Sequence, residues 1–220
     1  MSQPGGPPSL GSMDRPFIGI AGLIGVGKST LAQALASHLD IPVHYEPVSD
    51  NTYLEDFYAE TAKHAFAMQV YLLNRRFQQH QEIIWAGRGA VQDRTIYEDS
   101  IFAKVLRDSG LMHPRDYDTY LSLFRNLSHF MCRPTAIVYL DVSPDTSFER
   151  IQSRGRSCEN VIDLAYLKSL HKEYELFVED ISRIIPVIRV GWEQFGDTEA
   201  IANAITREVS RANYLRDVKL

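Results

Sequence analysis

Short apolar runs alternate with longer segments of helical periodicity along most of this 220-residue chain. Each run is bounded by turn-forming residues, a pattern typical of strands that are buried on both faces of a sheet. The predicted strands are residues 17–21, 43–45, 90–92, 136–140 and 187–190.

The segments between these runs carry apolar residues at three- and four-residue spacing, which predicts amphipathic helices. In 59–82, for example, Phe66, Val70 and Leu73 fall on one stripe. Because strands and helices alternate, we expect an α/β fold in which five parallel strands are flanked by helices. The predicted helices are 29–39, 59–82, 97–109, 114–130, 143–153, 162–184 and 198–214.

Composition limits the number of domains and the environment of the chain. With 45% hydrophobic residues, the chain can build one α/β core, which we place at 16–220. Residues 1–15 are rich in Pro, Gly and Ser and lack the apolar core of a signal peptide, so we expect a disordered N-terminal tail. No apolar run approaches the roughly 18 residues of a membrane span.

The net charge limits the possible binding partners, and the cysteines indicate the cellular compartment. The net charge of −5 provides no general basic field for a nucleic acid or an anionic membrane. Cys132 and Cys158 lack metal-ligand spacing, and two free thiols are typical of a reducing compartment. We therefore expect a cytoplasmic protein that binds neither nucleic acid nor membrane.

The stretch "GLIGVGKST" follows the first predicted strand and opens the first predicted helix. It matches G-x-x-x-x-G-K-[ST], in which glycines let backbone N–H groups surround phosphate oxygens. Lys28 is expected to bridge the β- and γ-phosphates, and the Ser29 hydroxyl to bind Mg²⁺. The sequence therefore predicts a nucleoside triphosphate site. Its residues are Gly22, Gly25, Gly27, Lys28, Ser29 and Thr30.

Charged residues also follow the second and third predicted strands, at the sheet edge where ligands bind in parallel α/β folds. Glu46 could orient and deprotonate an acceptor hydroxyl, or could be a surface glutamate. Arg94 could neutralise a transferred phosphoryl group and Asp93 could reach Mg²⁺ through water, unless the two form an ordinary surface pair.

An arginine cluster lies beyond the fourth predicted strand, in "ERIQSRGRSCE". Arg150, Arg154 and Arg156 fall near one helix end and turn, which suits a lid over phosphates at about residues 150–160, although a solvated basic turn would have the same composition. Three classes of protein remain open at this point: a kinase for a small acceptor, a nucleotide-dependent switch and an ATPase module.

These segments, in this order, resemble the deoxynucleoside kinase family, and the closest motif match is to the purine deoxynucleoside kinases of bacteria and protists. The resemblance spans about residues 17–195. It rests on the glycine loop, Glu46-Pro47, Gln69-Val70-Tyr71 with Arg76, Asp93-Arg94-Thr95, and the run 150–156 followed by Glu159.

The resemblance implies a three-layer P-loop kinase fold and a role for each matching residue. Glu46 resembles the general base for the 5′-hydroxyl, and Arg94 the arginine that contacts this hydroxyl and the moving phosphoryl group. Arg154 and Arg156 resemble the lid arginines.

The binding residues for sugar and bases follow from the same resemblance. Tyr58 and Glu159 would hold the 3′-hydroxyl, and Gln69 would read the edge of the nucleobase. Phe102 would pack against the acceptor base, and Phe195 would stack on the donor adenine.

The chain also departs from the animal members of the family. Asp93 stands where those members have glutamate, and there is about one residue fewer between Asp99 and Phe102. Arg76 and Asp99 are assigned to base contacts, where an acidic group would favour adenine or cytosine. Asp99 could equally lie on a helix surface.

The sequence thus predicts transfer of the γ-phosphoryl group of ATP, with Mg²⁺, to a deoxynucleoside. Deoxyadenosine is favoured, with deoxyguanosine and deoxycytidine as further candidates. A thymidylate-kinase-like nucleoside monophosphate kinase is the rival of the same class, although Glu46 would repel its phosphorylated acceptor. The resemblance also implies a homodimer.

Overall fold

The structure is a computed structural model that describes residues 15–46, 51–156, 159 and 161–212. The predicted disordered tail, apart from Arg15, lies outside the described residues, and so does Cys158. Cys132 is a free thiol.

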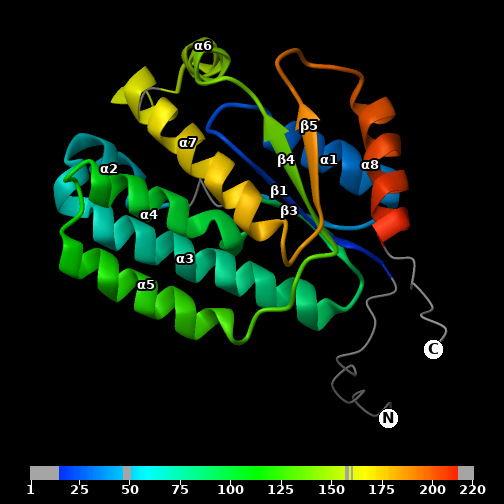
Figure 1. Cartoon of the computed structure of the whole chain (residues 1–220), viewed down its shortest axis with the longest axis horizontal. Coiled ribbons are helices and arrows are strands. Elements are labelled where there is room, and N and C mark those ends of the chain that lie inside the picture. Colours follow the sequence, from blue (N-terminus) through cyan, green and yellow to red (C-terminus); the bar gives the residue numbers. More distant parts are fainter. Residues whose placement is uncertain (1–14, 47–50, 157–158, 160, 213–220) are drawn as a thin grey trace.

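Five strands form one parallel sheet in the order β2-β3-β1-β4-β5 (Figure 1). The central strand β1 is buried at all six positions, as its continuous apolar sequence requires. The predicted five-stranded parallel sheet is therefore confirmed. Its strands are β1 (Phe17–Gly22), β2 (Val43–His44), β3 (Ala90–Asp93), β4 (Ala136–Asp141) and β5 (Val187–Gly191).

Helices cover both faces of this sheet and make a three-layer molecule (Figure 1). Helices α1 and α8 pack together on one face, while α3, α4, α5 and α7 form the layer on the other. The helices are α1 (Lys28–Leu39), α2 (Leu54–Ala59), α3 (Thr61–Ala86), α4 (Asp99–Asp108), α5 (Pro114–Ser128), α6 (Pro144–Arg154), α7 (Leu164–Ile181) and α8 (Thr198–Ala212), with a 3₁₀ turn η1 (Ile96–Glu98).

Two large apolar clusters hold these layers together, and a third, small one joins Ile83 of α3 to Phe17 and Ala90 of the sheet. One joins the sheet to α1, α7 and α8, and the other lies within the helical layer among α2, α3, α4 and α5. Side-chain caps fix where α6 and α7 begin: Ser143 Oγ accepts from the Thr146 N–H, and Asp163 Oδ1 accepts from the Tyr166 N–H. The second cluster forms the wall of the cleft described below.

The helix predicted at 59–82 corresponds to α3, which runs four residues further, and the short helix α2 before it was not predicted. The chain forms the short helix α2, breaks at Glu60, where φ is −136° and ψ is 67°, and then continues as α3 to Ala86. The break turns α2 across the end of α3, and this places residues of both helices in one cleft.

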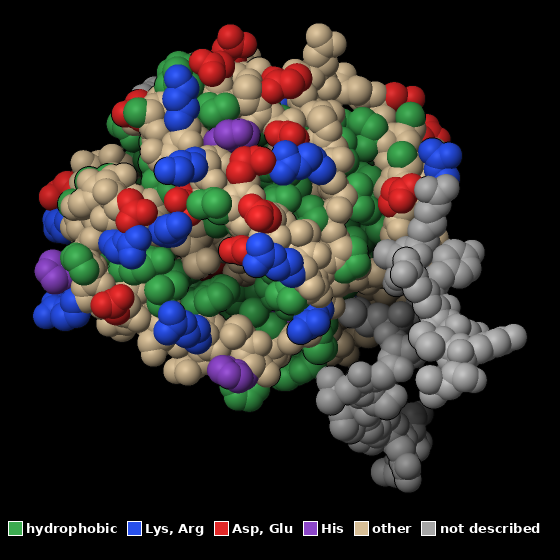
Figure 2. All heavy atoms as spheres, in the orientation of Figure 1, with side chains coloured by type: hydrophobic (Ala, Val, Ile, Leu, Met, Phe, Trp, Pro, Cys, Tyr) green, Lys and Arg blue, Asp and Glu red, His purple; other side chains and the backbone are tan. Residues whose placement is uncertain are grey.

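Acidic and basic side chains are interspersed over the face shown in Figure 2, which carries α4, α5 and α7. This face therefore presents no field of a single sign to a polyanion. Within the described residues, no helix is long and apolar enough to cross a membrane.

His80 on α3 makes stability depend on pH. Its ring is fully buried, its Nε2 accepts from the Cys132 N–H at 3.0 Å, and burial lowers its pKa from 6.5 to about 4. Only the unfolded chain takes up a proton between these two values, so stability is complete above the unfolded pKa and falls as the pH drops toward the folded one.

We expect His80 to remove about 2 kcal/mol from the free energy of unfolding between about pH 7 and about pH 5. Urea unfolding at both pH values should show that the free energy of unfolding falls less in a His80→Gln variant than in the native chain, by that amount. A His38→Gln variant is the matched control, because His38 is exposed. Equal losses in all three proteins would contradict this account.

Candidate active site

The loop between β1 and α1 turns through three glycines in the left-handed region. Gly22, Gly25 and Gly27 have φ values of 145°, 78° and 94°, which other residues adopt only with strain. A Cβ on Gly27 would also lie 2.8 Å from the Phe195 ring. The loop thus needs glycine both for its conformation and for its close approach to the segment after β5.

Lys28 begins α1 and is almost completely buried. Its Nζ donates to the carbonyl oxygens of Gly22 at 3.1 Å and Leu23 at 2.6 Å. Burial, followed by the charge of Arg94, lowers the pKa of Lys28 to about 8. An ammonium held in this way is a binding group for an anion on the loop.

Ser29 and Asp93 connect the loop to the end of β3. The Ser29 Oγ donates to Asp93 Oδ2, while Asp93 Oδ1 is buried without a hydrogen-bond partner. Burial raises the pKa of Asp93. A hydroxyl and a carboxylate with an unpaired oxygen are hard ligands that suit Mg²⁺. No cluster of three or more His, Cys, Asp or Glu side chains able to hold a metal occurs among the described residues.

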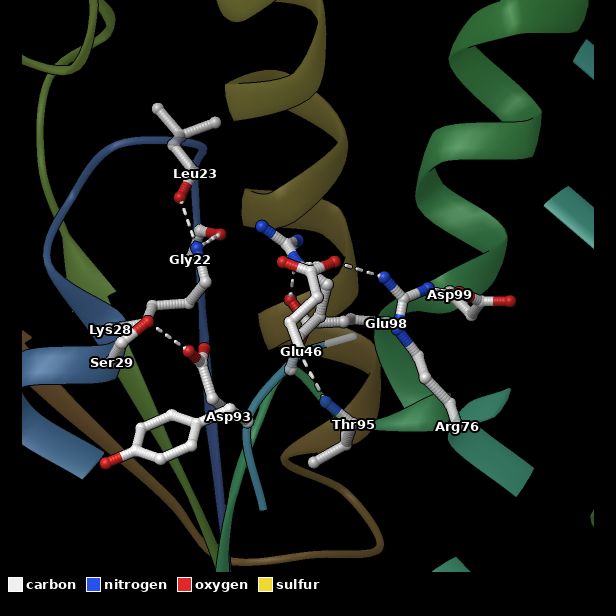
Figure 3. A network of polar contacts seen from close by, with 12 residues as sticks. Gly22, Leu23, Lys28, Ser29, Glu46, Arg76, Asp93, Thr95, Glu98 and Asp99 are labelled. Atoms are coloured by element: carbon white, nitrogen blue, oxygen red, sulfur yellow. Dashed lines mark hydrogen bonds and ion pairs between the residues drawn. The ribbon is translucent and has the colours of Figure 1, made fainter. Parts of the chain in front are cut away.

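Glu46 follows β2 and lies between the loop residues and Arg76 (Figure 3). Its Oε1 accepts from Arg76 Nη2 at 2.6 Å and lies 3.1 Å from Arg94 Nε. Burial alone would raise the pKa of Glu46, but the charges of Arg94, Arg76 and Lys28 outweigh it and lower the pKa to about 2. Glu46 is therefore an ionised carboxylate at the sheet edge, 23% exposed to the cleft.

Asp99 lies neither on a helix surface nor at the base-binding wall, the two positions expected from the sequence. It is fully buried at the start of α4, so it is not a surface residue, and it does not line the cleft. It pairs with Arg76 and accepts a hydrogen bond of 2.6 Å from the Tyr120 hydroxyl. Asp99 thus contacts Arg76 from behind, and it is Arg76 that faces the cleft.

One cleft of about 710 Å³ runs from the glycine loop to α3. Its volume lies in the range of small-molecule sites. Of the residues assigned to the site from the sequence, only Gly22 and Asp99 are absent from its lining. The others that line it are Gly25, Gly27, Lys28, Ser29, Thr30, Glu46, Tyr58, Gln69, Arg76, Asp93, Arg94, Phe102, Arg150, Arg154, Arg156, Glu159 and Phe195.

Arg150 differs from the other two arginines of the predicted lid. Its guanidinium donates to the carbonyl oxygens of Val26 and Trp192, at 3.1 and 2.8 Å, and stacks 4.1 Å from the centroid of Phe195. Arg150 therefore ties α6 to the glycine loop and to the segment after β5. Phe195 itself is 62% exposed beside it.

Arg154 is the last residue of α6, and Gly155, whose φ is 65°, separates it from Arg156. Both guanidiniums pair with Glu159, and the Arg156 Nη1 lies 3.4 Å from its Oε1. Arg154 and Arg156, which were predicted to bind phosphate, thus both pair with Glu159, which was predicted to bind the sugar.

Several residues in or beside the site were not assigned to it from the sequence. Tyr166 lines the cleft, while Glu98 and Tyr174 contact Arg94 beside it. The spacing of Tyr174 matches a helical core stripe. The acceptor wall adds apolar and polar residues with no motif of their own: Asn51, Leu54, Phe57, Met68 and Leu72.

Fold and site together define a phosphotransferase in which a phosphate-binding loop faces a carboxylate and a guanidinium across one cleft. Comparison with known proteins agrees with this class. The sequence profile described as "Deoxynucleoside kinase" matches residues 18–213.

Relatives with assigned names cover nearly the whole chain. A deoxyadenosine kinase of Dictyostelium discoideum is 53% identical over 207 residues, which are 94% of this chain and 84% of that protein. A deoxyadenosine/deoxycytidine kinase of Bacillus subtilis is 37% identical over 200 residues, 88% and 92% of the two chains.

A solved structure supports the same assignment. Deoxyadenosine kinase from M. mycoides with bound dCTP superposes with a TM-score of 0.78 at 32% identity, covering 88% of this chain and 98% of that one. The chain belongs to the deoxynucleoside kinase family and is an enzyme that phosphorylates a deoxynucleoside.

Proposed function

We propose that this enzyme transfers the γ-phosphoryl group of ATP to the 5′-hydroxyl of a deoxynucleoside, with deoxyadenosine as the preferred acceptor. The observation that carries this proposal is the arrangement of the cleft. The glycine loop and Lys28 lie at one end, Gln69 lies in the wall formed by α3, and Glu46 and Arg94 stand between them.

Gln69 supports a base with an exocyclic amine. Its side chain is 2% exposed, and its Oε1 is buried without a hydrogen-bond partner. A glutamine amide can pair with adenine by accepting from N6 and donating to a ring nitrogen. Cytosine also carries such an amine, so the preference for deoxyadenosine rests in addition on the names of the relatives.

At the reacting end we assign Glu46 Oε2 to the 5′-hydroxyl, because both arginines already contact Oε1. The carboxylate orients the hydroxyl and accepts its proton as the new P–O bond forms. Arg94 and Lys28 stabilise the charge on the transferred phosphoryl group, which is where most of the rate acceleration of phosphoryl transfer arises.

Mg²⁺ would be held by Ser29 and by Asp93, whose unpaired buried oxygen fits a cation. Bound there, it would neutralise phosphate charge. Thr30 and the backbone of Gly25 and Gly27 would bind the phosphates of ATP.

We assign the remaining cleft residues from the contacts that they make in the structure. Arg150 and Phe195 bracket the position for the donor base, and Arg154 and Arg156 exchange their pairing with Glu159 for contacts with phosphate. Tyr58 and the released Glu159 then hold the sugar. A homodimer in the cytoplasm remains part of this proposal.

The function is tested by measuring ATP consumption with a panel of acceptors. We expect the highest kcat/KM for deoxyadenosine. Adenosine should be worse by roughly 5- to 150-fold, because an unpaired 2′-hydroxyl costs about 1–3 kcal/mol. Deoxyadenosine monophosphate should not react, because Glu46 repels its phosphate. Turnover of the monophosphate, or ATP hydrolysis that no acceptor stimulates, would contradict the proposal.

A further inference from the structure

Glu98 is a buried carboxylate for which the proposed reaction has no role so far. It ends η1 directly before α4, and its side chain is completely inaccessible. Its Oε1 accepts from the Thr95 N–H at 3.0 Å (Figure 3). This bond uses one carboxylate oxygen and leaves Oε2 directed elsewhere.

The second oxygen faces α7. Glu98 Oε2 accepts from the hydroxyl of Tyr174, which is also fully buried. The same hydroxyl accepts from Arg94 Nη1 at 2.5 Å, and Glu98 Oε2 lies 3.4 Å from this nitrogen. A chain of hydrogen bonds thus runs from Arg94 through Tyr174 to Glu98, and the hydroxyl uses its single proton on the carboxylate.

Arg94 also has an unusual backbone conformation. Its φ is 67°, in the left-handed region that non-glycine residues rarely adopt, and its N–H donates to the Ile20 carbonyl at 3.0 Å. The long side chain then reaches the cleft between Glu46, 3.1 Å from Nε, and the ring of Phe102, whose centroid is 4.6 Å from Cζ.

We propose that Glu98 and Tyr174 are positioning residues that hold the Arg94 guanidinium at the angle required for phosphoryl transfer. The contact to Glu46 fixes the Nε edge, the Tyr174–Glu98 pair fixes Nη1, and Phe102 supports one face. Three contacts on different sides leave the planar group one orientation. The inference rests on the role given to Arg94 in the proposed function.

The charge of Glu98 matters to this arrangement as well as its shape. A buried carboxylate is costly unless it is paired and hydrogen-bonded, and here Arg94 and Tyr174 supply both kinds of partner. A glutamine at 98 can still accept from the Thr95 N–H. It would, however, turn an NH₂ group toward the Tyr174 hydroxyl and Arg94 Nη1. The hydroxyl proton then loses its acceptor, and two donors face each other beside Arg94.

The first experiment measures kcat, both KM values and the melting temperature for Glu98→Gln and Tyr174→Phe. We expect kcat to fall by about 10- to 100-fold in both variants, since small misplacements of a catalytic group have effects of this size. The KM values should stay within about twofold, because binding groups are untouched. Tyr174→Phe retains the hydrogen bond between the Thr95 N–H and Glu98. It therefore still tests the proposal if Glu98→Gln folds poorly.

Tyr139→Phe is the matched control. The Tyr139 ring stacks on Tyr174, but its hydroxyl bonds to Glu175 at 3.2 Å, away from Arg94. We expect its kcat to be unchanged. Unchanged kcat in the two test variants, or a rise in KM in place of the loss in kcat, would overturn the proposal.

The second experiment repeats Glu98→Gln in an Arg94→Ala background, with single-turnover rates measured at excess enzyme. If Glu98 acts through Arg94, the substitution should cost nothing further there. The same loss in both backgrounds would show a structural role and overturn the proposal. Normal turnover of Arg94→Ala alone would instead refute the role of Arg94 in the proposed function, which separates the two failures.

Discussion

Replacing Lys28 with alanine is expected to lower kcat/KM for ATP by roughly 10³-fold or more. The Nζ is nearly buried and donates to two carbonyl oxygens of its own loop, so the ammonium is already in position at the phosphate-binding end of the cleft. Without it, the charge that develops between the β- and γ-phosphates loses the one ammonium that the glycine loop directs at it. Steady-state kinetics with varied ATP measure the loss.

Lys63→Ala is the matched control for this variant. Lys63 is exposed on α3 and pairs only with Glu60 among the ion pairs of the described residues, so its removal should leave the kinetics unchanged. A Lys28→Ala enzyme that keeps more than about a tenth of native kcat/KM would show that the loop binds ATP without this charge.

Replacing Glu46 with glutamine is expected to reduce kcat by about 10²-fold and to leave the KM for ATP nearly unchanged. The amide keeps an oxygen for Arg76 and Arg94, so the local structure is retained. It cannot take the proton of the 5′-hydroxyl. Rates at saturating ATP and deoxyadenosine give the change in kcat.

The low pKa of Glu46 sharpens this prediction. Because Arg94 and Arg76 outweigh burial and lower it to about 2, the free enzyme keeps Glu46 ionised throughout any practical assay range. The kcat/KM profile for deoxyadenosine should therefore show no acid limb from this group above about pH 4.

The matched control for Glu46→Gln is Glu55→Gln, because Glu55 is exposed on α2. Near-native kcat in Glu46→Gln would remove Glu46 from the reaction.

Local patterns in the sequence were sufficient for the sheet and for the phosphate-binding loop. Buried strands read as continuous apolar runs, and the glycine loop is a motif in which conformation and chemistry coincide. Glu46 and Arg94 could be placed at one edge because they directly follow parallel strands. The short helix α2 could not be predicted, since its six residues are too few to show a helical period.

The support of the site lies in contacts between distant parts of the chain. Tyr174 reads as one more core residue of α7, because its contact with Glu98 joins residues 76 positions apart. Asp99 reads as a base-contacting or surface residue, since nothing local indicates that Arg76 and Tyr120 enclose it. Burial of a charged residue depends on which helices pack over it, and periodicity within a single helix does not contain that information.

The most direct test of the account is a crystal structure of the enzyme with deoxyadenosine and a non-hydrolysable ATP analogue. The account predicts the 5′-oxygen at hydrogen-bond distance, about 2.6–3.2 Å, from Glu46 and within reach of Arg94, in line with the γ-phosphate on the glycine loop. The adenine should meet the Gln69 amide. A 5′-hydroxyl directed away from Glu46, with the nucleoside bound elsewhere in the cleft, would contradict it.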